Sequence, residues 1–111
     1  MASTPLLVIT TVATREQALT LARDLVERRL AACAQITAID SIYRWQGAVE
    51  QDSEFRLLLK TRADGYAALE AAIRARHPYE LPAIHAITTV QAHIPYAEWV
   101  EASTQPEPGA D

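Results

Sequence analysis

The chain has 111 residues, half of them hydrophobic, which predicts a single globular domain with a small core. Ten Lys and Arg residues against fourteen Asp and Glu residues give a net charge of −4, and no basic run occurs. We expect no nucleic-acid partner, because neutralising phosphates requires clustered Lys and Arg. No apolar run approaches the roughly 18 residues of a membrane span, so we expect no membrane partner either.

The single cysteine, Cys33, excludes a disulfide within the chain and fits a reducing compartment. Residues 1–5 lack the positive and apolar regions of a signal peptide. These features make a cytoplasmic location the default expectation.

We expect residues 1–5 to be flexible and the first strand to follow them. Residues 6–12 form a β-branched apolar run, which is typical of a central strand buried on both faces. Thr14 and Gln17 match a capping box, so a helix is expected from there to about Leu30. The domain as a whole is expected over residues 6–102.

A long β-hairpin is predicted next. The spacing of Ile36 and Ile39 interrupts the alternation of apolar residues and predicts a bulge or bend. Residues 41–60 then read as two strands that reverse at Gln46 and Gly47, where glycine supplies the positive φ of a tight turn. Because both arms are long for so small a domain, we expect the tip to project beyond the body.

A second helix is predicted after the hairpin. Thr61 with Asp64 resembles a helix cap, and the apolar stripe that follows extends to about Arg76. Pro78 ends the helix, because the residue before a proline disfavours helical angles.

The last part of the chain begins with a stiff loop over residues 77–82 that contains two prolines. A strand is expected over about residues 83–91, and a short helix over residues 96–102. Residues 103–111 are polar with two prolines and a glycine, and we expect them to be disordered.

The element order β-α-β-β-α-β with a final helix predicts an α+β fold of the ferredoxin-like split βαβ type. Two helices would cover one face of a four-stranded antiparallel sheet, and the strand beginning at Cys33 would lie at an edge. A long edge strand carrying Ile42, Tyr43 and Trp45 would aggregate unless covered. The sequence therefore predicts an oligomer that forms through the hairpin.

Four blocks together resemble the CutA divalent-cation tolerance family: L-V-E-R-R-L-A-A-C (25–33), S-I-Y-R-W-Q-G (41–47), L-L-K-T-R (58–62) and H-P-Y-E-L-P (77–82). The resemblance covers about residues 6–99. It implies a ferredoxin-like homotrimer whose hairpins extend onto neighbouring subunits, and binding of copper and other divalent cations. The similarity of such trimers to PII-type signalling proteins suggests small-ligand sensing by analogy.

No motif for covalent or cofactor chemistry occurs, so we expect no enzyme. A metal site would draw on Cys33, His77 and Glu80, since imidazole with carboxylate suits Cu(II) first and Zn(II) second. Cys33 is alternatively a small buried hydrophobe, and His77 a cap for helix carbonyls. Some family members carry a second cysteine where this chain has Thr10, which disfavours a two-thiolate Cu(I) site.

A cleft for a small anionic metabolite is the second hypothesis for function. It would use Tyr43, Trp45, Lys60 and Arg62 between subunits of a PII-like sensor that signals to a protein partner. The alternative for the two aromatic residues is packing between subunits. A small enzyme with Cys33 as nucleophile ranks lowest, because it requires both a base within hydrogen-bond reach and an exposed thiol with a lowered pKa.

Overall fold

A computed structural model of the protein describes residues 3–105. The elements are β1 (Leu6–Val12), α1 (Arg15–Glu27), β2 (Cys33–Trp45), β3 (Ala48–Thr61), α2 (Tyr66–Arg76), β4 (Ile84–Thr88) and α3 (Ile94–Ser103). The predicted order is therefore confirmed. None of these helices is long and apolar enough to cross a membrane. Most of the tail predicted to be disordered, residues 106–111 of 103–111, lies outside the described residues, as do residues 1 and 2 of the N-terminal segment.

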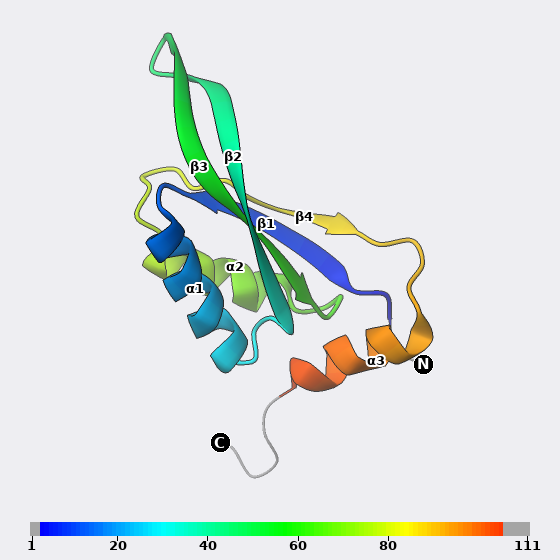
Figure 1. Ribbon diagram of the computed structural model, residues 1–111. Helices are drawn as coiled ribbons and strands as arrows, with labels where there is room; N and C mark the ends of the chain where they lie inside the picture. The colour runs from blue at the N-terminus through cyan, green and yellow to red at the C-terminus, as the bar shows by residue number, and fades with distance from the viewer. Residues whose placement is uncertain (1–2, 106–111) are drawn as a thin grey trace.

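The sheet has four strands in the order β2-β3-β1-β4, and every neighbouring pair is antiparallel. Helices α1 and α2 cover one face of it (Figure 1), and the core forms between them and the alternate side chains of β1 and β3. Fully buried leucines from both layers, among them Leu25, Leu57, Leu59 and Leu69, fill this space. The predicted edge position of β2 is confirmed.

The β2–β3 hairpin has an unbroken register from Cys33 opposite Lys60 to Trp45 opposite Ala48. The bulge predicted near Ile36 and Ile39 is therefore wrong. These two side chains point to opposite faces of one regular strand, so their spacing of three needs no extra residue. Pairing between β1 and β3 stops at Phe55, and the outer part of the hairpin projects beyond the sheet as expected (Figure 1).

The reversal uses two residues, Gln46 with φ 50° and Gly47 with φ 83°. Positive φ at both positions is the signature of a type I′ turn, whose twist matches that of the flanking strands. The turn fixes which residues of β2 and β3 face each other along the whole hairpin.

Helix α1 has the predicted capping box: the Thr14 hydroxyl accepts from the Gln17 amide at 3.1 Å, and the Gln17 side chain accepts from the Thr14 amide at 3.2 Å. The helix ends at Glu27 rather than Leu30, because the chain turns at Arg29 with φ 60°.

The predicted cap of α2 is wrong. Gly65 occupies the N-cap position without a side-chain hydrogen bond. The Thr61 hydroxyl donates instead to the Leu30 carbonyl at 2.9 Å, and Asp64 pairs with Arg62. Further along, β4 is shorter than the expected strand over residues 83–91, and α3 is longer than residues 96–102.

The turn generates the first prediction. Replacing Gly47 by Ala should lower stability by about 1 kcal/mol, because the left-handed conformation crowds a Cβ against its own backbone. Nothing lies within 4 Å of that Cβ, so the cost arises from the backbone alone. Replacing Gln46 by Asn, which tolerates positive φ, should instead raise stability by roughly a few tenths of a kcal/mol. Thermal unfolding at fixed protein concentration measures both; equal effects of the two changes would contradict the turn assignment.

Two buried threonines generate a second prediction. Thr10 on β1 and Thr61 on β3 both face the helices, but only the Thr61 hydroxyl has a partner, while within residues 3–105 that of Thr10 has none. Thr10→Val should therefore stabilise the fold by about 1 kcal/mol, and Thr61→Val should destabilise it by a similar amount. Urea unfolding distinguishes them. A Thr10→Val variant as unstable as Thr61→Val would show that the Thr10 hydroxyl is satisfied in solution.

Candidate functional site

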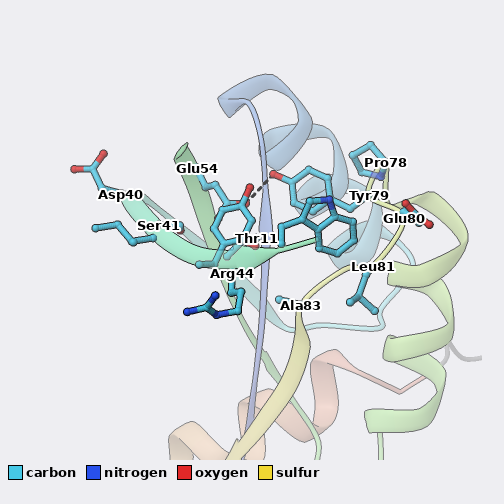
Figure 2. A pocket seen from close by; sticks show the side chains of 13 residues that line it. Thr11, Asp40, Ser41, Arg44, Glu54, Pro78, Tyr79, Glu80, Leu81 and Ala83 are labelled. Atoms are coloured by element: carbon cyan, nitrogen blue, oxygen red, sulfur yellow. Dashed lines mark hydrogen bonds between the residues drawn. The ribbon is translucent and has the colours of Figure 1, made fainter. Parts of the chain in front are cut away.

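A cavity of about 890 Å³ lies between the outer part of the hairpin and the loop that follows α2. Strand β2 contributes residues 40–45, β3 contributes Glu54, and the loop contributes residues 78–81 (Figure 2). The cavity therefore depends on how the loop is held against the hairpin.

His77 fixes the start of that loop with both of its ring nitrogens. Nδ1 accepts a hydrogen bond from the Tyr79 amide at 3.1 Å, so Nε2 carries the proton and donates to the Thr11 carbonyl at 2.7 Å. Burial lowers the pKa of His77, although the Thr11 bond and the charge of Glu54 act in the opposite direction. The neutral imidazole thus ties the loop to the end of β1.

Tyr79 carries the connection onward to the hairpin. Its ring contacts that of His77 with centroids 4.8 Å apart, and its hydroxyl donates to Glu54 at 2.7 Å (Figure 2). Burial, followed by the bond to Glu54, raises the pKa of Tyr79. Because the phenol keeps its proton at physiological pH, this donor is permanent.

Tyr43 makes the same kind of contact further along the hairpin, where its hydroxyl donates to Asp52. That bond, with smaller contributions from desolvation and from the negative charges of Asp52, Glu50 and Glu54, raises the pKa of Tyr43 to about 12. The phenols of Tyr43 and Tyr79 thus donate to two carboxylates, Asp52 and Glu54, on the same face of β3.

The residues predicted to bind metal do not come together within one chain. Cys33 lies opposite Lys60, which lies opposite Leu7 on β1, whereas His77 binds Thr11. At roughly 3.3 Å per residue, these points on β1 are about 13 Å apart. Among residues 3–105 no three His, Cys, Asp or Glu side chains form a group that could hold a metal ion.

The four residues predicted to form an anion cleft also separate into two pairs. Tyr43 and Trp45 line the cavity. Lys60 lies near the other end of the hairpin, with its ammonium 5.5 Å from the centroid of the Tyr96 ring. Arg62 pairs with Asp64 at 2.5 Å and with Glu101 at 3.9 Å. A cleft that contains all four side chains can form only between chains.

Sequence reasoning missed Asp52, Glu54 and Tyr79 as parts of the site. The two-residue turn would have revealed the carboxylates, because it places Glu50 opposite Tyr43 and so puts Asp52 and Glu54 on the face of Tyr43 and Trp45. Tyr79 belongs to the same loop as His77 and Glu80. No spacing rule links that loop to the hairpin, so its contact with Glu54 required the structure.

These features define a class of small α+β proteins with a four-stranded antiparallel sheet and a projecting hairpin. Residues 6–103 match the family model described as CutA1 divalent ion tolerance protein. The chain belongs to this family.

Individual relatives and a solved structure support this family assignment. The divalent-cation tolerance protein CutA of Thermus thermophilus is 42% identical over 98 residues, covering 87% of this chain and 95% of that protein. Human protein CutA is 42% identical over 86 residues, covering 77% of this chain, which spans about half (48%) of the human protein. The structure of the periplasmic divalent cation tolerance protein CutA from Archaeoglobus fulgidus is similar with a TM-score of 0.89 and 30% identity, covering 91% of this chain and 99% of that one.

The state of His77 generates a third prediction. Because its pKa in the folded protein lies below the ordinary value of 6.5, its contribution to stability is constant above pH 6.5. Below that pH the unfolded chain binds the proton more readily, so stability is lost until the pH falls below the folded pKa.

An NMR titration of the ring should give a pKa below 6.5 and the tautomer protonated at Nε2. The loss of stability between roughly pH 7.5 and pH 5.5 should be smaller in His77→Gln than in the wild type. A ring pKa above 6.5, or the same loss in both proteins, would contradict this account.

Proposed function

We propose that the protein is a non-enzymatic homotrimer that binds divalent cations, Cu(II) first and Zn(II) second, in divalent-cation tolerance. Membership of the CutA1 divalent ion tolerance family is the observation that carries the proposal. On this proposal the order of the elements and the strand order β2-β3-β1-β4 correspond to the ferredoxin-like split βαβ topology.

The exposed side of the hairpin supports assembly. Ile42 and Val49 share one face of the outer hairpin and are 70% and 65% exposed. The backbone edge of β2 is also unpaired within the described chain, since β2 ends the strand order. Apolar side chains next to an open strand edge are favourable for contact with another subunit. We assign this surface to the trimer contact.

The proposed metal ligands remain Cys33, His77 and Glu80. Because Cys33 and His77 lie at opposite ends of the sheet, a shared site needs contributions from two subunits. A metal at His77 must also replace one of the two hydrogen bonds of its ring. Glu80 is exposed and is available in either arrangement.

The cytoplasm is the proposed location, because the single thiol fits a reducing compartment. The relative from Archaeoglobus fulgidus is described as periplasmic, a description that applies to that protein.

A PII-like trimeric sensor that signals to a protein partner is the second candidate function. One observation favours it: Tyr43 and Trp45 line a cavity of the size that small-molecule ligands occupy. If the ligand is an anionic metabolite, Lys60 and Arg62 must reach this cavity from a neighbouring subunit.

Native mass spectrometry with Cu(II) and Zn(II) tests the proposal. We expect a trimer with about one copper ion bound per subunit, because one metal site of fixed geometry is proposed for each subunit. Copper uptake should fall in Cys33→Ser and Glu80→Gln, which leave the hydrogen bonds of His77 intact, and in His77→Ala. His93→Ala is the matched control, since His93 is exposed and its side chain makes no cap hydrogen bond.

A monomeric mass would contradict the assembly. Uptake that is no greater for copper than for any added ion, or that is equal in the wild type and all three ligand variants, would contradict the metal site. A trimer without specific metal uptake would favour the sensor.

A further inference from the structure

Aromatic and acidic side chains share one face of the outer hairpin. Tyr43 lies directly opposite Glu50, and the alternation of side chains puts Trp45, Asp52 and Glu54 on the same side. We call these five residues the acidic–aromatic face. Arg44 alternates with the two aromatic residues, and Figure 2 shows its guanidinium on the other side of the β2 ribbon from Tyr79.

Three residues of the acidic–aromatic face, Tyr43, Trp45 and Glu54, line the cavity, and the loop after α2 supplies a third ring, that of Tyr79. Tyr43, Trp45 and Tyr79 all line the space of about 890 Å³, a volume typical of small-molecule sites. Trp45 is half-buried although it stands beside the hairpin turn. The rings therefore line a hollow rather than lying flat on an open surface.

The charged residues that line the cavity are mostly acidic: Asp40, Glu54 and Glu80 against one cation, Arg44. Asp52 and Glu54 accept hydrogen bonds from phenols, and within residues 3–105 neither carboxylate forms an ion pair with Lys or Arg. The nearest cation on the same side of β3 is Arg56, which is exposed. The charges of Glu50, Asp52 and Glu54 contribute to the raised pKa of Tyr43, which is the response expected of a phenol in a negative field.

This combination suits an organic cation better than a metal ion. A metal ion needs several oxygen or nitrogen atoms converging on one point, and the described residues contain no such group of side chains. An ammonium group instead needs the faces of aromatic rings and a carboxylate nearby. The negative charge also opposes an anionic ligand at this position.

We propose that the cavity between the outer hairpin and the loop after α2 binds a small organic ammonium ion. The rings of Tyr43, Trp45 and Tyr79 contact the cationic group, and Glu54 balances its charge while it keeps the hydrogen bond from Tyr79. The site goes beyond the proposed function, since it needs no metal ligand and gives the cavity a ligand of the opposite charge to the metabolite considered above.

Three probes with one aromatic body and different charge test the proposal: benzyltrimethylammonium, benzyl alcohol and benzoate. Titration of the full chain, followed by the NMR signals of the Trp45 indole and the Tyr79 amide, should show saturable binding of the ammonium. The neutral and anionic probes should bind at least about tenfold more weakly, because they lack the attraction to the rings and to Glu54.

Variants locate the site. Trp45→Leu and Glu54→Gln should each weaken ammonium binding about five- to thirty-fold, the range expected for a partly desolvated cation–ring or ion-pair contact. Trp99→Leu and Glu98→Gln are matched controls on α3, where both residues are exposed, and should bind like the wild type.

Three results would overturn the proposal: no saturable binding of benzyltrimethylammonium by the folded wild type, equal binding of benzoate, or equal effects of the α3 controls and the cavity variants. The first would mean that the cavity is filled in the assembled protein, for example by a neighbouring subunit. Measuring the mass and the copper uptake of the same sample separates this failure from a failure of the proposed trimer or metal site.

Discussion

The constraint on which the site depends is the backbone conformation at Gln46 and Gly47. Positive φ at both residues closes a two-residue turn, and that turn fixes the register of every pair from Trp45–Ala48 to Cys33–Lys60. A slip of one residue would move Glu54 to the other face of the hairpin. The acidic–aromatic face and the contact with Tyr79 would both be lost.

The hairpin alone does not make the cavity; the loop after α2 completes it. His77 binds the Thr11 carbonyl at the end of β1, and Tyr79 binds Glu54 on β3. These contacts join three segments that are distant in the sequence.

The family membership and the geometry describe different aspects of the protein: the first links it to divalent-cation tolerance, and the second gives a cavity with negative charge and aromatic walls.

The sequence predicted what local patterns determine and missed what tertiary contacts determine. An apolar run predicted β1, alternation with the turn at Gly47 predicted the hairpin, and Thr14 with Gln17 predicted the start of α1. The bulge predicted from the spacing of Ile36 and Ile39 was the exception among these local patterns. The expected cap at Thr61 failed because its hydroxyl binds the Leu30 carbonyl across the core, a contact that no local pattern encodes. The hydrogen bond from Tyr79 to Glu54 could not be predicted for the same reason, because it joins residues far apart in the sequence.

A double-mutant cycle between Tyr79→Phe and Glu54→Gln tests the central claim most directly, because these side chains meet only if the register and the loop position are both correct. We expect the two changes in unfolding free energy to be coupled by about 1 kcal/mol or more, as for a hydrogen bond to a charged acceptor. Changes that add within about 0.3 kcal/mol would show that the loop does not hold the hairpin, and would contradict the account.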